Sequence, residues 1–141
     1  MPTAENPVLL YDGECGLCRA LVRRLARADQ AGRLRYAPLQ GTFGQLTLRR
    51  LGLPTADFDS LLFLPTAAAT EFHTRTDGVL AVLALLGPGT SRVASLARRV
   101  PSSWRDAAYR LVARVRYRIF GRVDYVAGEA PGPELAGRFI P

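Results

Sequence analysis

The sequence predicts an α/β fold with three layers, in which a small sheet lies between helices. Two observations predict it. Up to residue 87, runs typical of strands and helices follow in the order strand, helix, strand, helix, strand, strand, helix. The only two cysteines, Cys15 and Cys18, form a CxxC pair between the first strand-like run and the helix-like run after it.

The first strand is predicted over residues 8–11, a short apolar run that ends at Asp12 and Gly13, a pair typical of turns. A helix is expected to follow and to end near Gly32. Its apolar positions recur at the spacing of one helix face, at Cys18, Leu21, Val22 and Leu25. Residues 34–37 alternate apolar and polar side chains before Pro38 and predict the second strand.

The second helix is predicted over residues 43–51, where Gly52 stops it. Residues 60–64 predict a strong third strand and residues 70–74 a weaker fourth, which together form an antiparallel hairpin. A third helix is expected to open at Asp77 and to stop at Gly87-Pro88-Gly89. A CxxC within the order βαβαββα is the plan of the thioredoxin fold, which places Cys15 at a helix N-terminus.

Residues 88–141 are predicted to form an arginine-rich helical extension that packs on the thioredoxin-like core of residues 1–87, within one integrated domain. A short helix from Val93 should end at Pro101, and Ser103 with Asp106 should cap a longer helix. The apolar stripe of the longer helix consists of Ala108, Leu111, Val112, Val115 and Ile119. We expect this stripe to pack on the sheet in preference to lying on an anionic membrane. Trp104 and Tyr109 are expected to be packing residues.

Composition and charge limit the class of protein. The chain has 141 residues, 48% hydrophobic and 22% charged, which is typical of a globular domain. The N-terminus does not have the pattern of a secretory signal and no long apolar run predicts a transmembrane helix, so the expected location is the cytoplasm. The net charge of +7 comes largely from arginines after residue 91 and could attract an anionic partner. No nucleic-acid motif is present, so no nucleic acid is expected as a partner.

A CxxC pair serves either dithiol redox chemistry or one half of a zinc site. A closed zinc site takes four ligands, and the chain offers besides the two cysteines only His73, which lies far downstream. Zinc within one chain is therefore disfavoured, although a site between two chains stays open. His73 is expected to be a solvated side chain. No GxGxxG motif appears, and we expect neither a cofactor nor a metal.

The chemistry assigned to the pair follows from its place at a helix N-terminus. Unpaired backbone N–H groups and the helix dipole favour a thiolate, so Cys15 is predicted to be the attacking thiol. Cys18 lies one turn further along on the apolar stripe, and we expect it to be more buried and to resolve the mixed disulfide. Asp12 is the third candidate catalytic residue. Its carboxylate could exchange a proton during the reaction or could cap backbone N–H groups of the turn.

Several segments resemble the DCC family of thiol-disulfide oxidoreductases, also called DUF393. Residues 12–18, Asp-Gly-Glu-Cys-Gly-Leu-Cys, are similar to its signature. Further similar segments follow in order at residues 34–40, 75–80, 117–122 and 133–139. The chain differs from many relatives at Tyr125-Val126, where they carry a further cysteine. It also differs from thioredoxins, which have a cis-proline before the third strand where this chain has Asp59.

The resemblance and the residues together predict a thiol-disulfide oxidoreductase of the protein-disulfide reductase type. The expected partners are a disulfide-containing protein or small molecule as substrate, and a thiol or a reductase as electron donor. The alternative is a non-catalytic module whose basic C-terminal helices bind an anionic membrane or nucleic acid. A peripheral membrane contact is the less favoured expectation.

Overall fold

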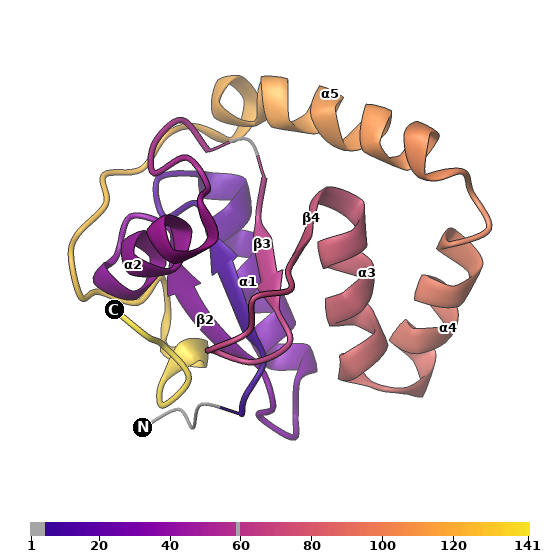
Figure 1. Cartoon of the computed structure of the whole chain (residues 1–141), viewed down its shortest axis with the longest axis horizontal. Coiled ribbons are helices and arrows are strands. Elements are labelled where there is room, and N and C mark those ends of the chain that lie inside the picture. Colours follow the sequence, from indigo (N-terminus) through magenta and orange to yellow (C-terminus); the bar gives the residue numbers. More distant parts are fainter. Residues whose placement is uncertain (1–4, 59) are drawn as a thin grey trace.

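The sheet at the centre of the protein has four strands in the order β2-β1-β3-β4. The computed structural model describes residues 5–58 and 60–141, so Asp59 lies outside the described residues. The strands are β1 (Val8–Tyr11), β2 (Arg35–Pro38), β3 (Leu62–Leu64) and β4 (His73–Thr74), and the helices are α1 (Gly16–Ala28), α2 (Thr42–Leu51), α3 (Arg75–Leu86), α4 (Pro88–Ala97) and α5 (Ser102–Phe120). Figure 1 shows their arrangement.

The strand pairing confirms the predicted topology. β1 pairs in parallel with β2, with Leu9 opposite Tyr36, and α1 provides the crossover between them. On its other side β1 pairs antiparallel with β3, which in turn forms an antiparallel hairpin with β4. The order βαβαββα and the mixed sheet together give a thioredoxin-like fold with a C-terminal helical extension.

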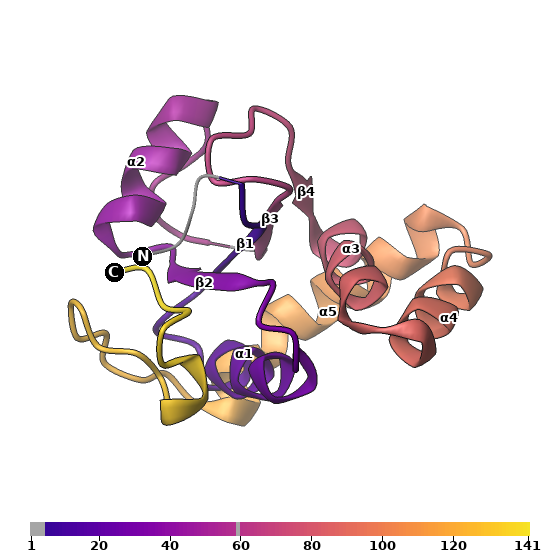
Figure 2. The ribbon, with the colours of Figure 1, turned by 90° about the horizontal axis from the view of Figure 1, so that it is seen from below.

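Alternate residues of β1 face opposite sides of the sheet and bury two cores. Leu9 and Tyr11 belong to a core with residues of α1 and α3, including Val22 and Val82. Val8 and Leu10 belong to the second core, which includes Leu48 of α2. Because both faces of β1 are covered, all four of its residues are buried, as a continuous apolar run requires. Figure 2 shows the sheet between α2 and α1, so the three predicted layers are present.

The hairpin strands are shorter than predicted because polar groups end them. The predicted third strand begins at residue 60, but the ladder starts at Leu62. Leu61 donates its backbone N–H to the hydroxyl of Tyr109 at 3.1 Å, and the Ser60 hydroxyl accepts the N–H of Arg75 at 2.8 Å. The predicted fourth strand of residues 70–74 is reduced to two residues.

Several predicted helix boundaries are wrong. α1 ends at Ala28, before the predicted end near Gly32, and α3 begins at Arg75, before Asp77. The next helix does not start near Val93, since Gly87 ends α3 and Pro88 begins α4 at once. Proline suits this place because the first helical N–H has no partner within the helix. The predicted cap at Ser103 is also wrong, since Pro101 precedes α5 without a side-chain cap. Asp106 instead accepts a hydrogen bond from the Thr76 hydroxyl at 2.7 Å and so links α5 to α3.

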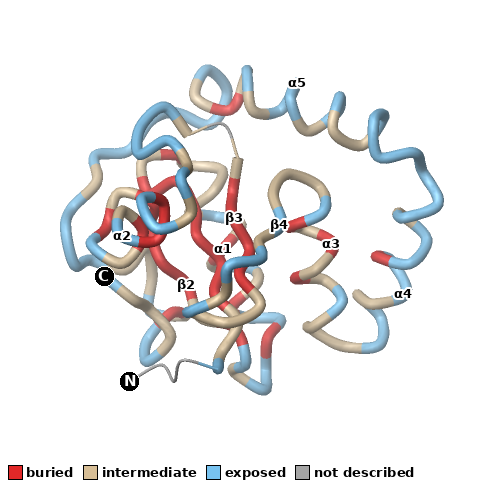
Figure 3. Tube along the Cα trace, in the orientation of Figure 1, coloured by how far each residue is buried: buried red, intermediate tan, exposed pale blue. Residues whose placement is uncertain are grey.

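Only part of the apolar stripe of α5 faces inward, where Val112 lines a cavity beside Cys18. Tyr109, Arg116 and Tyr117 lie on the inner side, and Arg116 is buried. Leu111 and Ile119, predicted to pack on the sheet, are exposed, and so is Trp104. The prediction is wrong because a polar network, described below, orients the helix. Figure 3 shows α5 exposed along most of its length, with a buried point near its C-terminal end.

The chain after α5 returns to the core. Residues 121–123 run beside the start of α1, and the last residues reach the free edge of β2. There the backbone N–H of Tyr36 donates to the backbone carbonyl of Arg138 at 2.9 Å. Leu135, in a short 3₁₀ turn, is buried in the core that contains Leu9 and Tyr11. Figure 2 shows the C-terminal segment passing α1 toward β2. In the described part of the chain, no helix has the length and apolarity needed to cross a membrane.

Candidate active site

Cys15 is the N-cap residue of α1, as predicted from its place in the sequence. Its backbone is extended, and its sulfur accepts the backbone N–H of Cys18 at 3.3 Å. A residue at this position normally supplies a side-chain acceptor to the free N–H groups of the first turn. The sulfur therefore takes the place of a capping oxygen, and a negative charge on it is stabilised by the helix.

The two thiols have opposite acidities. The pKa of Cys15 is lowered from 9.0 to about 6, chiefly by the hydrogen bond from the Cys18 side chain. The N–H groups of Cys18 and Leu17 and the charge of Arg116 lower it further, against the opposing effect of burial. The pKa of Cys18 is raised, because its thiol is the donor to Cys15, because its sulfur is largely removed from water, and because it lies beside the Cys15 charge. At neutral pH the pair therefore holds a thiolate on Cys15 and a thiol on Cys18.

The solvent exposure of the two cysteines differs from the prediction. Cys15 is 0% exposed, whereas Cys18 is partly exposed, so the expectation that Cys18 is the more buried is wrong. The reason is the segment formed by the last residue of α5 and the residues that follow it. The Gly16 N–H donates to the Gly121 carbonyl at 3.3 Å, and the Val123 N–H donates to the Glu14 carbonyl at 2.7 Å. We call residues 120–123 the covering segment.

Gly16 allows the covering segment to approach the motif this closely. A Cβ atom at this position would lie 2.5 Å from the backbone oxygen of Phe120, a distance that real side chains do not adopt. A side chain at this position would therefore be excluded by the backbone at the end of α5. The absence of a side chain lets the turn that carries the two cysteines contact that backbone directly.

Asp12 lies at the end of β1, 1% exposed, and both its oxygens are used. Its Oδ1 accepts the backbone N–H of Glu14 at 2.9 Å and the side-chain amide of Gln40 at 2.7 Å. Its Oδ2 accepts the hydroxyl of Tyr117 and forms an ion pair with Arg116 at 3.2 Å. The predicted hydrogen bond from a backbone N–H of the turn to Asp12 is thus present. The ion pair with Arg116 is an additional contact that the sequence did not indicate.

Arg116 joins Asp12 to the dithiol. It is 5% exposed, and one terminal nitrogen donates to the sulfur of Cys18 at 3.3 Å while the other pairs with Asp12 and with the Phe58 carbonyl. A buried guanidinium requires such partners, because an unpaired buried charge is costly. Sequence patterns did not single out this residue among the arginines of α5. Its neighbour Tyr117 opens one of the segments that resemble the DCC family.

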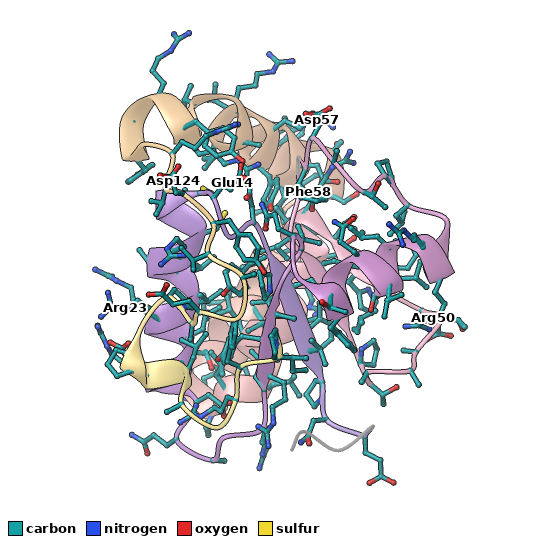
Figure 4. All side chains as sticks on the ribbon, turned by 90° about the vertical axis from the view of Figure 1, so that its left-hand side faces the viewer. Glu14, Arg23, Arg50, Asp57, Phe58 and Asp124 are labelled. Atoms are coloured by element: carbon teal, nitrogen blue, oxygen red, sulfur yellow. The ribbon has the colours of Figure 1, made fainter. Side chains whose placement is uncertain are left out.

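Tyr117 and Gln40 complete the surroundings of Asp12. Burial raises the pKa of Tyr117, and its hydrogen bond to Asp12 raises it further, so its hydroxyl stays protonated and donates. Neither residue was predicted, although both lie in segments that resemble the family. A polar cavity of about 270 Å³ lies beside Asp12, Gln40 and Tyr117. In Figure 4, Glu14 and Phe58 lie near the end of α5 although they come from separate loops.

An apolar cavity of about 150 Å³ adjoins Cys18. Leu17, Leu21, Tyr109 and Val112 are among its lining residues. The ion pair of Arg116 with Asp12 connects the two cavities, because Arg116 lines the apolar one and Asp12 the polar one.

His73, which is predicted to be a solvated side chain, lies away from this site. It is exposed on β4 and packs against the ring of Phe63 with 6.1 Å between ring centroids. Among the described residues, no group of three or more His, Cys, Asp or Glu side chains is placed to hold a metal ion.

Comparison with known proteins identifies the family of the chain. The family model of the DCC1-like thiol-disulfide oxidoreductases matches residues 9–122, which include both cysteines, Asp12 and Arg116. YuxK of Bacillus subtilis (strain 168), named as an uncharacterized protein, is 34% identical over 96% of this chain and 95% of its own. A DCC family protein of Arabidopsis thaliana, named as chloroplastic, is 28% identical over 85% of this chain and 68% of its own. No solved structure matches. The chain belongs to the DCC1-like thiol-disulfide oxidoreductase family.

Proposed function

We propose that the protein reduces or exchanges disulfides through the Cys15/Cys18 dithiol. The observation that carries the proposal is the opposite acidity of the two thiols at one helix N-terminus. A pKa of about 6 keeps about nine-tenths of Cys15 as thiolate at pH 7, whereas an ordinary cysteine is only a few per cent thiolate there. The thiolate is the attacking species in disulfide exchange.

The reaction proceeds in two balanced steps. The Cys15 thiolate attacks one sulfur of the substrate disulfide, forms a mixed disulfide and releases the other sulfur as a thiolate. Cys18 then loses its proton and attacks the Cys15 sulfur, which releases the second substrate thiolate and leaves the Cys15–Cys18 disulfide. The substrate gains two electrons and the protein loses two. An external thiol or reductase returns them, and we propose a reducing compartment such as the cytoplasm for this cycle.

Cys15 remains the proposed nucleophile although Cys18 is the more exposed. To reach Cys15, a substrate must displace the covering segment, which is held by two backbone hydrogen bonds at about 1 kcal/mol each. The raised pKa of Cys18 keeps this thiol protonated at pH 7, so the more exposed sulfur is not the nucleophilic species. Opening of the covering segment would instead expose the Cys15 thiolate.

Asp12 is proposed to receive the proton that Cys18 loses in the second step. The support is its burial next to Arg116, which contacts the Cys18 sulfur, and the polar cavity beside it, whose water would carry the proton because a guanidinium cannot accept one. Such a role affects resolution of the mixed disulfide and not its formation. Asp12→Asn should therefore slow only the second step in a rapid-mixing experiment.

Reduction of insulin with dithiothreitol as electron donor tests the proposed activity. We expect the intact protein to accelerate precipitation of the insulin chains and Cys15→Ser to abolish the acceleration. Circular dichroism establishes that the variant is folded. Full activity in Cys15→Ser would refute the assignment of the nucleophile.

A further inference from the structure

The outer side of α5 exposes large apolar side chains in a row. Trp104, Leu111 and Ile119 are 71%, 62% and 66% exposed. Their spacing places them on one side of the helix, since the turn repeats every 3.6 residues. This side is free because the opposite side of α5, with Tyr109 and Arg116, is held on the core.

A second row, of arginines, runs alongside the apolar one. Arg110, Arg114 and Arg118 recur at intervals of four residues and are all exposed. In the described part of the chain, none of them forms a side-chain ion pair. The only acidic residue between residues 88 and 122 is Asp106, which faces α3 and accepts the Thr76 hydrogen bond. We call these two rows the α5 outer face.

An exposed apolar row flanked by cations matches the chemistry of one partner. A helix that lies in a membrane surface buries its apolar side about 5–10 Å deep and sets its arginines against anionic headgroups. A second copy of the chain fits less well. A symmetric dimer through this face would bring the arginine rows of both copies together without acidic residues to pair them.

We propose that the α5 outer face docks on anionic phospholipid membranes. Because the inner side of the same helix supplies Arg116 to the dithiol, docking would hold the proposed active site close to the membrane surface.

Trp104 is the only tryptophan of the chain and reports directly on this contact. Vesicles of phosphatidylcholine mixed with phosphatidylglycerol should shift its fluorescence to shorter wavelength and carry the protein down on sedimentation at low salt. Vesicles of phosphatidylcholine alone should do neither, and high salt should release the protein. Absence of binding to the anionic vesicles at low salt would overturn the proposal.

Two variants locate the contact. Replacing Arg110, Arg114 and Arg118 by Gln should weaken binding about a hundred-fold, since each arginine near an anionic surface contributes about a factor of five. Leu111→Ser with Ile119→Ser should weaken it about ten-fold or more without unfolding the protein, because both side chains are exposed. Insulin reduction in solution should be unchanged in both variants, which separates this proposal from the proposed function.

A charge-matched control excludes attraction by net charge alone. Arg24, Arg33 and Arg49 are exposed and lie outside α4 and α5, so their replacement by Gln removes the same charge elsewhere. This control should bind far more tightly than the α5 arginine variant, and equal weakening of the two would overturn the proposal. Dimerisation that shields Trp104 and is lost in the serine variant would also overturn it, as would binding to duplex DNA without binding to anionic vesicles.

Discussion

Removing the Cys18 thiol should raise the pKa of Cys15. The hydrogen bond from Cys18 is the largest cause that lowers this pKa from 9.0 to about 6. In Cys18→Ala the side-chain donor is lost, while the backbone N–H of residue 18 and the Arg116 charge remain. The variant therefore isolates one physical contribution to the acidity of the proposed nucleophile.

The size of the effect follows from the strength of such a bond. A hydrogen bond to a charged group contributes about 1.5–3 kcal/mol, which corresponds to a pKa rise of about one to two units. The pKa of Cys15 should thus rise to between about 7 and 8. The thiolate fraction at pH 7 would fall from about nine-tenths to between about one-half and one-tenth.

The assay is a pH titration of the ultraviolet absorbance of the thiolate, which does not require access to the buried sulfur. The intact reduced protein should show a first step near pH 6, assigned to the coupled pair and carried mainly by Cys15. Cys18→Ser is the matched variant, because its hydroxyl can still donate to Cys15 and should keep the pKa lower than in Cys18→Ala. Equal pKa values in the intact protein and in Cys18→Ala would refute the reasoning.

Three further predictions concern the stability of the site. Gly16→Ala should lower the free energy of unfolding in urea by about 1–3 kcal/mol and speed alkylation of Cys15, because the new Cβ displaces the covering segment. Gly89→Ala is the control, since nothing lies within 4 Å of a Cβ at that position, and it should leave the free energy of unfolding unchanged or raise it. Arg116→Leu should lower the free energy of unfolding by about 3–5 kcal/mol, because Asp12 is left buried without its cation. Adding Asp12→Asn to this variant should recover part of the loss, and no recovery would argue against the ion pair. Between pH 6 and 9 the folded protein binds fewer protons at Cys15 than the unfolded chain does, so the reduced protein should gain stability as the pH rises through this range. Unfolding followed at several pH values measures this gain, which Cys15→Ser should lack.

The sequence predicts the part of the fold that apolar patterns and turns determine. The β1 run is buried on both faces, and its end at Asp12 places Cys15 at the start of α1, as the order of elements required. The parallel pairing of β1 with β2 follows from the helical crossover between them. These features depend on neighbours in the chain, so the sequence alone predicts them.

The orientation of α5 could not be predicted in the same way. Its apolar pattern favours burial of Leu111 and Ile119, but the ion pair of Arg116 with Asp12 and the hydrogen bond of Tyr109 to Leu61 turn the opposite side inward. These partners are distant in the sequence, and an arginine has no pattern that marks it as buried. The covering segment over Cys15 was missed for the same reason, since only the folded chain brings Gly121 beside Gly16.

Trapping the mixed disulfide tests the role of the dithiol most directly. Cys18→Ser protein incubated with a small aromatic disulfide should accumulate a mixed disulfide on Cys15 and release one aryl thiolate. The adduct is visible by intact-mass spectrometry as one added arylthio group and is located by peptide mapping. The adduct should form faster as the pH rises toward 7, following the Cys15 thiolate. In Cys15→Ser, Cys18 should remain largely unmodified under the same conditions. Rapid modification of Cys18 in Cys15→Ser, with no adduct on Cys15 in Cys18→Ser, would contradict the assignment of Cys15 as the attacking thiol.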